Sequence, residues 1–181
     1  RALLERRQVL VADETGWKLT TTRAAATLDA LLECAASGAY HRALLDLLKS
    51  PHLFSDVEPA LRAAAVHRIE LAMRRHGVRA GIAATRHALL AEMEALRDAA
   101  SDAGDVDPAA SGLAQNLLDR VEAATIILGG KPVSLVRWLA RLRRALAVVA
   151  ALDPLSADAA GAEVLGLIDQ RSAELEGVTS L

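Results

Sequence analysis

A row of three arginines is the strongest candidate in this sequence for contact with a charged ligand. Arg137, Arg141 and Arg144 are spaced i, i+4 and i+7, so on a helix their guanidinium groups share one face. Such a row can contact the phosphates of a nucleic acid. Two other interpretations stay open, with Arg143 close by: a solvated face or inter-helix salt-bridge row, and a contact to another domain. We take Arg137, Arg141 and Arg144 as candidates for DNA contact.

The chain contains the segment Gly129-Gly130-Lys131-Pro132, which resembles part of a phosphate-binding loop. The residues at two other positions that the motif requires do not fit it. A Walker A loop needs a glycine five residues before the glycine that precedes the lysine. It also needs a serine or threonine after the lysine to reach Mg²⁺. This chain has Thr125 and Pro132 at those positions. The two glycines therefore predict the end of one helix, ahead of the next.

The remaining reactive residue types are scattered, and we predict no catalytic residue, metal site, cofactor or small-molecule substrate. The histidines lack the HxxxH spacing of a helical zinc site. Cys34 lies among alanines and leucines, which predicts a buried apolar side chain. Asp13 and Glu14 are typical turn residues, because metal-dependent cleavage needs carboxylates that converge on one cation. Asp158 lies near a helix start and is predicted to cap it.

The composition excludes several classes of protein. The chain has 181 residues, a net charge of −2, 52% apolar residues and 2% aromatic residues. Strand-forming residues are scarce, which argues against a β-sandwich or barrel, and a disordered chain would be less apolar. One cysteine excludes a disulfide framework. Uncharged apolar runs fall short of the roughly 18 residues that a membrane helix needs, so we expect a cytoplasmic protein without a membrane partner.

Hydrophobic periodicity predicts an all-α fold of about seven helices in an irregular bundle. At most one short strand is expected, near residues 9–12. Residues 101–112 are small, acidic and glycine-bearing, and we expect a mobile linker there. Thr22, Asp56 and Ser134 are the expected N-caps. The expected helices span about residues 22–37, 40–49, 57–75, 82–100, 113–128, 134–149 and 156–176.

Three residues are predicted to have structural roles. Gly16 belongs to a turn, and Trp17 follows it, so we expect Trp17 to fix that turn against the domain. Trp138 is predicted to lie in the core together with Leu135 and Leu142, because these residues share one face of a helix.

Several segments resemble a known family of DNA-processing proteins. The string from Leu10 to Thr22, preceded by residues 1–5 and followed by the leucine-rich residues 43–51, resembles the region after motif IV of UvrD/RecB-type superfamily 1 helicases, in its AddB-like form. Residues 69–75 and 155–165 are also similar to AddB-type proteins. The resemblance covers most of the chain in order.

The resemblance implies a piece of a bacterial DNA-repair protein of the helicase-like, PD-(D/E)XK nuclease family. Residues 1–22 would be the junction to a helicase-like lobe, and residues 23–181 the helical insertion of that lobe, its 2B-type subdomain. The helical pattern already begins at Arg1, and for this reason too we expect the chain to be a segment of a longer protein. No catalytic residue of the family carries over, so we expect a non-catalytic fragment of a parent nuclease.

The expected function is a helical scaffold and DNA guide in double-strand-break processing. The partners that the resemblance implies are the rest of the parent protein, DNA bound through the parent, and a helicase partner subunit. A free-standing helical protein–protein interaction module is the alternative. A small helical enzyme or ligand-binding bundle is a third interpretation, which a deep pocket with perturbed titratable groups would favour.

Overall fold

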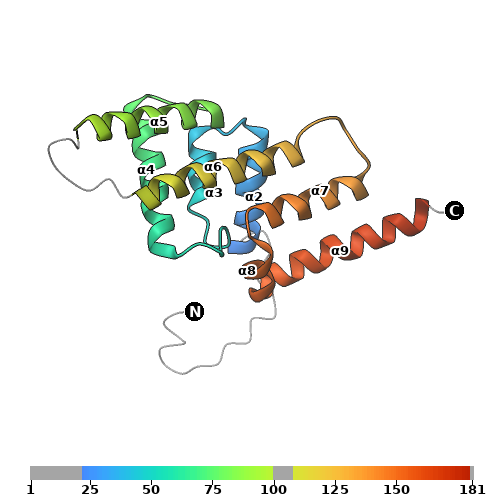
Figure 1. Ribbon diagram of the computed structural model, residues 1–181. Coiled ribbons are helices and arrows are strands. Elements are labelled where there is room, and N and C mark those ends of the chain that lie inside the picture. Colours follow the sequence, from blue (N-terminus) through green and yellow to red (C-terminus); the bar gives the residue numbers. More distant parts are fainter. Residues whose placement is uncertain (1–21, 100–107, 180–181) are drawn as a thin grey trace, which may run out of the picture.

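The computed structural model describes residues 22–99 and 108–179, and this part of the chain is all-α (Figure 1). The predicted fold class is therefore confirmed. The expected strand at 9–12, Gly16, Trp17 and the junction up to residue 21 lie outside the described residues. The helices of the described part are α2 (Arg23–Ala36), α3 (His41–Leu48), α4 (Pro59–Arg75), α5 (Ile82–Ala99), α6 (Pro108–Leu128), α7 (Leu135–Val148), α8 (Leu152–Ala157) and α9 (Ala159–Thr179).

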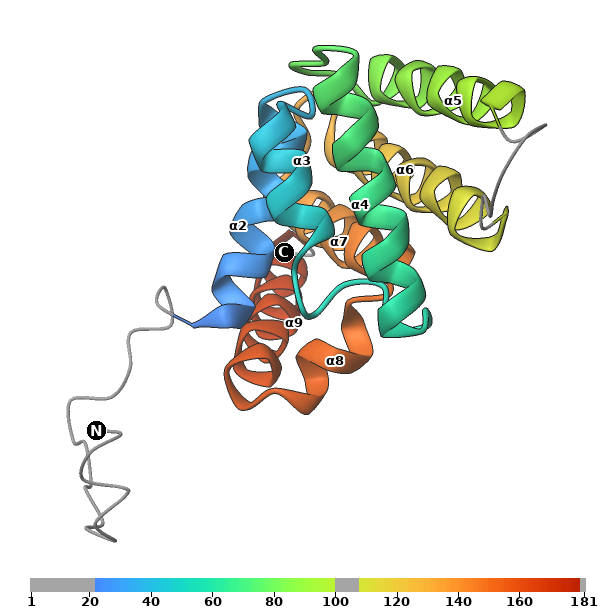
Figure 2. The same cartoon turned by 90° about the vertical axis from the view of Figure 1, so that its left-hand side faces the viewer.

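The helices form two layers. Figure 2 shows α2, α3 and α4 upright and side by side, and Figure 1 shows α5, α6, α7 and α9 crossing them in that order from top to bottom. α6 lies at the centre and packs against α2, α4, α5 and α7. α5 and α6 form an antiparallel pair, as do α6 and α7. α4 and α5 are in contact but cross at a steep angle (Figure 2).

One continuous hydrophobic core joins the two layers. Leucine and alanine supply most of it, as the composition predicts, because small side chains let helices approach closely. α3 buries Leu44, Leu47 and Leu48 completely, and Phe54 in the following loop is also fully buried. The short leucine-rich helix therefore buries one face against α2 and α4, while Arg42 and Asp46 on its other face are exposed.

The helix starts confirm some predicted caps and correct one. Thr22 accepts a hydrogen bond from the backbone N–H of Ala25 at 3.2 Å, and Asp158 accepts one from Gly161 at 2.8 Å, so both cap as predicted. The prediction for Asp56 is wrong. Pro59 opens α4, and Glu58 is its N-cap and accepts from the Leu61 N–H at 2.7 Å. Ser134 is the N-cap residue of α7, but its side chain makes no capping hydrogen bond.

Two prolines account for the helical residues that the sequence pattern missed. α6 begins at Pro108, so the last five residues of the expected linker 101–112 are helical, and residues 100–107 lie outside the described part. Asp153-Pro154 lies inside the extra helix α8 instead of separating two helices. Proline lacks an N–H, and the first turn of a helix does not need that donor. The expected seven helices thus become eight in the described residues.

The corner between α8 and α9 depends on a close backbone approach at Gly161. A Cβ atom at this position would lie 2.2 Å from the carbonyl oxygen of Leu155, which is far inside van der Waals contact. Only glycine fits there without moving one helix. This contact sets the start of α9, whose next turns pack against α2 and α7.

Candidate nucleic-acid interface

An acid-free, basic stretch of the sequence surrounds α7. Residues 123–152 contain five cationic side chains and no acidic one, whereas the whole chain has a net charge of −2. Four of the five are arginines on α7, and the fifth is Lys131 in the loop before it. This segregation is visible in the sequence as an acid-free stretch. It is a stronger signal than the spacing of three arginines alone.

The register of α7 separates an apolar face from an arginine face. Leu139, Leu142, Ala145 and Leu146 are buried against the rest of the bundle. Arg137 and Arg144 are exposed on the opposite side, with the small side chain of Ala140 between them. Because the side chain of Ala140 is small, it does not project between the two arginines, and an extended ligand can approach both guanidinium groups.

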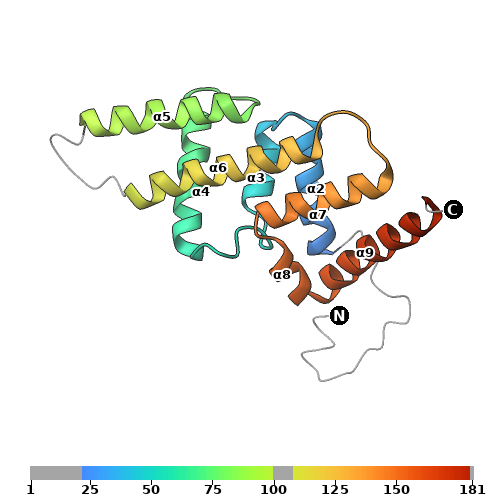
Figure 3. The ribbon, with the colours of Figure 1, turned by 45° about the vertical axis from the view of Figure 1, so that its right-hand side comes forward.

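The predicted core face of α7 needs a correction at its first turn. Leu135 was expected to face inward, but 56% of its surface is exposed. Trp138 is half-buried and packs against the core from its edge. Both residues lie near the turn where α6 and α7 extend beyond the α2–α4 layer (Figure 3), so fewer neighbours are present to cover them.

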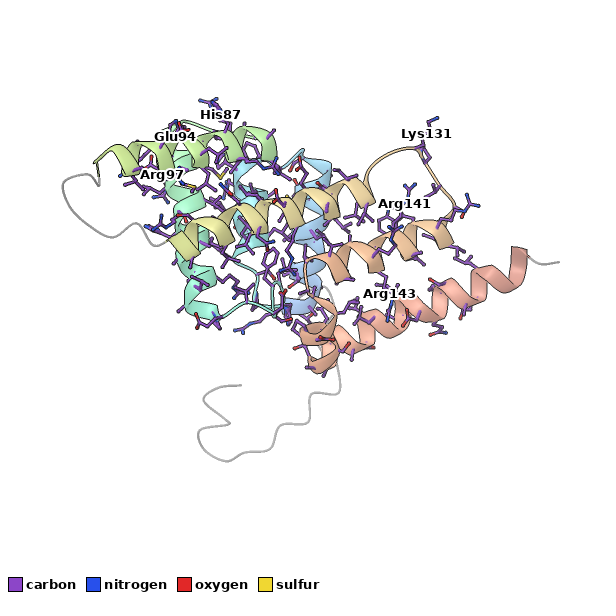
Figure 4. The ribbon with its side chains drawn as sticks, viewed as in Figure 1. His87, Glu94, Arg97, Lys131, Arg141 and Arg143 are labelled. Atoms are coloured by element: carbon purple, nitrogen blue, oxygen red, sulfur yellow. The ribbon has the colours of Figure 1, made fainter. Side chains whose placement is uncertain are left out.

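Arg141 does not lie free beside Arg137 and Arg144. Its guanidinium donates to the backbone carbonyls of Gly129 at 3.2 Å and Lys131 at 3.4 Å, just past the end of α6 (Figure 4). Carbonyls at a helix C-terminus lack intrahelical donors and carry partial negative charge, so they attract a cation. Arg141 therefore holds the α6–α7 turn, and this role separates it from the other two candidates.

Arg143 lies on the flank of α7 that faces α9 (Figure 4). Its guanidinium forms an ion pair with the carboxylate of Asp169 at 2.7 Å. Among the described residues, Arg137 and Arg144 have neither an acidic partner nor a carbonyl acceptor. The predicted row is thus divided: two arginines face solvent, one closes a turn, and the adjacent Arg143 bridges to α9.

Several arginines elsewhere in the bundle are bound to partners on other elements. Arg86 of α5 reaches Asp119 and Glu122 of α6, each at 2.7 Å, and the hydrogen bond with Glu122 raises the pKa of Arg86. Arg75 of α4 pairs with the buried Glu92 of α5. Arg68 of α4 donates to the buried hydroxyl of Ser111 at 2.8 Å. These contacts fix how α4, α5 and α6 cross.

Arg120 of α6 joins three segments of the fold. Its Nε donates to the carbonyl of Val148, the last residue of α7, at 2.8 Å. Its terminal nitrogen lies 3.1 Å from both carboxylate oxygens of Asp56, and its guanidinium carbon lies 4.9 Å from the centre of the Phe54 ring. This cation–π contact and the backbone hydrogen bond from Phe54 to Val149, at 2.8 Å, tie the loop before α4 to the end of α7.

A buried polar cluster that the sequence pattern did not reveal lies at one end of a groove between α2 and α3. The groove has a volume of about 560 Å³, and the hydroxyls of Thr27 and Ser50 line it. Thr27 Oγ1 lies 2.8 Å from Ser50 Oγ and 3.0 Å from Nδ1 of His52, and it also donates to the Arg23 carbonyl at 2.9 Å. The cluster satisfies its own hydrogen bonds and ties the loop after α3 to α2. Ser50 and His52 follow Thr27 by 23 and 25 positions, so no short spacing in the sequence marks this cluster.

Cys34 is fully buried in the hydrophobic core. Burial raises the pKa of the Cys34 thiol to about 11, so it stays protonated near neutral pH. In the part of the chain that the structure describes, no three histidine, cysteine or acidic side chains gather as a metal site. No helix in that part is long and apolar enough to cross a membrane.

Comparison of the chain with models of protein families, with curated proteins and with solved structures finds no match. The candidate site consists of two exposed arginines on one face of α7, and a turn and a bridge to α9 hold this helix in place.

Proposed function

We propose that this chain is a non-catalytic helical scaffold that contacts the phosphates of DNA through the exposed face of α7. The observation that carries the proposal is the pair Arg137 and Arg144, which lie outward in an acid-free segment although the chain as a whole is acidic. Cations without internal partners are free to exchange counterions for phosphates. Lys131, exposed in the loop before α7, adds a third cation near this face.

The spacing of the pair favours a long polyanion over a single phosphate group. Arg137 and Arg144 are seven residues apart on one helix, which corresponds to a rise of about 10.5 Å between their Cα atoms. One phosphate cannot bridge two guanidiniums at that separation, whereas a nucleic-acid strand presents several in succession. Few aromatic side chains are available for base stacking, so we expect contact with the backbone rather than sequence readout.

The resemblance to AddB-like proteins supports the wider proposal. We propose that the chain is the 2B-type helical subdomain of a bacterial, cytoplasmic DNA-repair protein, and that it helps to guide DNA during double-strand-break processing. The partners in this proposal are the rest of the parent protein, DNA and a helicase partner subunit. With only two or three free cations at the α7 face, the isolated chain should bind DNA weakly near physiological salt and should hydrolyse neither DNA nor ATP.

Fluorescence anisotropy with a labelled duplex at low salt tests the α7 contact. The variant Arg137→Ala/Arg144→Ala should bind at least tenfold more weakly than the wild-type chain, because it loses both outward cations of α7. The matched control is Arg42→Ala/Arg97→Ala, which removes the same charge from exposed positions on α3 and α5. Equal losses in the two variants would show that only net charge matters and would reject the interface.

Exposed apolar side chains favour protein–protein interaction as a second candidate function. Ile126 near the end of α6 is 71% exposed, and Leu135 at the start of α7 is 56% exposed. Large apolar side chains at such exposure are typical of contact surfaces when they cluster. Sedimentation of the wild-type chain and of Ile126→Ser/Leu135→Ser distinguishes the two proposals. Self-association that the double variant removes, with unchanged DNA binding, supports the interaction module.

A further inference from the structure

The ion pair between α7 and α9 withholds one cation from the α7 surface. Nη1 of Arg143 lies 2.7 Å from the carboxylate of Asp169, and both side chains are about half exposed. Arg143 follows Arg141 and precedes Arg144, so its Cα is within one helical turn of the outward arginine face. A polyanion on that face lies within reach of a long, flexible arginine side chain.

Arg143 and Arg141 differ in how easily they can be released. The acceptors of Arg141 are backbone carbonyls that belong to the α6–α7 turn, and no side-chain change removes them. The acceptor of Arg143 is a single exposed carboxylate, and such surface ion pairs add little to stability because water and salt screen them. A phosphate can therefore replace Asp169 as the partner of Arg143 at small cost.

We propose that Asp169 is an internal competitor for phosphate at the α7 surface, so that Arg143 changes its partner from Asp169 to a DNA phosphate when DNA binds. This inference rests on the proposed function of α7. The ion pair lowers the affinity of the chain for DNA, because a phosphate must first displace the Asp169 carboxylate from Arg143. It also removes a polar link between α7 and α9, which then depend on the buried Leu165 and Ile168 for contact.

The test compares four chains in duplex-binding titrations over a range of salt concentrations: wild type, Asp169→Asn, Arg143→Ala, and the double variant. Asp169→Asn keeps the size of the side chain and frees Arg143. We expect this variant to bind the duplex about threefold more tightly than the wild-type chain at low salt, because it gains one phosphate contact. Each additional phosphate contact steepens the salt slope by about 0.9. In the Arg143→Ala background, Asp169→Asn should have no effect on the slope.

Glu174→Gln is the matched control. Glu174 also lies on α9, but it pairs with Arg171 and Gln170 of the same helix, so its removal changes net charge equally without freeing an α7 cation. Equal effects of Asp169→Asn and Glu174→Gln, or an effect of Asp169→Asn that persists without Arg143, overturn the inference.

The proposed function fails separately from this inference. It fails when Arg137→Ala/Arg144→Ala binds as well as the wild-type chain, and the inference then fails with it. When that double variant loses affinity but Asp169→Asn behaves like Glu174→Gln, α7 is a DNA contact and only the competition by Asp169 is wrong.

Discussion

Several arginines of α4, α5 and α6 lie against partners on neighbouring helices and loops, whereas two arginines of α7 lie in solvent. The first group faces carboxylates: Arg75 meets Glu92, Arg86 meets Asp119 and Glu122, and Arg120 meets Asp56. Arg137 and Arg144 have no such group opposite them in the described part of the chain. The same side chain therefore has two uses in one small fold.

The difference between the two regions follows from where the acids are placed. α5 supplies Glu92 to an arginine of α4, and α6 supplies Asp119 and Glu122 to an arginine of α5, so these arginines align helices. α7 and its flanking loops contain no acid, so charge on its outer face is compensated only by solvent ions. Arg137 and Arg144 are therefore informative about ligand contact, because no carboxylate of the described residues pairs with them.

Replacing Arg120 should cause the largest loss of stability among these arginines. Arg120→Ala removes the hydrogen bond to Val148, the contact with Asp56 and the cation–π contact with Phe54, and its side chain is only 16% exposed. We expect the free energy of unfolding to fall by about 2–4 kcal/mol, measured by urea denaturation. Arg144→Ala, on the solvent face, should change it by less than about 0.5 kcal/mol. Similar losses for both variants would remove the distinction between the two regions.

Arg86 provides an intermediate test within the partnered region. Arg86→Ala breaks both ion pairs between α5 and α6, and we expect a loss of about 1 kcal/mol in the free energy of unfolding, because the group is partly exposed. Arg97→Ala, on the same helix but exposed, is the matched control and should have almost no effect. A stronger effect at Arg97 than at Arg86 would contradict the assignment.

The smallest effect should depend on pH. Glu70 of α4 accepts a 2.7 Å hydrogen bond from Lys49 of α3, and this bond lowers the pKa of Glu70. A carboxyl whose pKa is lower in the folded state stabilises the fold above its unfolded pKa. It loses that contribution as the pH falls through the folded pKa. Wild type should therefore exceed Glu70→Gln by about 0.5 kcal/mol near neutral pH, and the difference should vanish in acid, as thermal denaturation at several pH values can show.

The fold class and most helices could be predicted from the sequence, because apolar residues repeat at the helical period. The ends of the helices were harder to predict. Pro108 and Pro154 look like breaks in a sequence, but both lie within the first turn of a helix, where proline is tolerated. The role of Gly161 could not be seen either, since its need for glycine comes from the carbonyl of Leu155 in the preceding helix.

The candidate site was predicted in part. The spacing of Arg137, Arg141 and Arg144 correctly identifies one side of a helix, but it cannot show that the end of α6 supplies carbonyls to Arg141. Nor does spacing reveal that Asp169, 26 residues after Arg143, returns to pair with it. Both facts depend on the antiparallel turn and the path of α9, which are tertiary features.

The salt dependence of DNA binding tests the division of arginines most directly. For the wild-type chain, for Arg137→Ala/Arg144→Ala and for Arg86→Ala, the logarithm of the affinity for a duplex is plotted against the logarithm of salt concentration. Each phosphate contact contributes about 0.9 to the slope. The account predicts a slope shallower by about 1.8 for the α7 double variant, and a slope for folded Arg86→Ala equal to that of the wild type. Identical slopes for all three chains, or a shallower slope for Arg86→Ala alone, would contradict it.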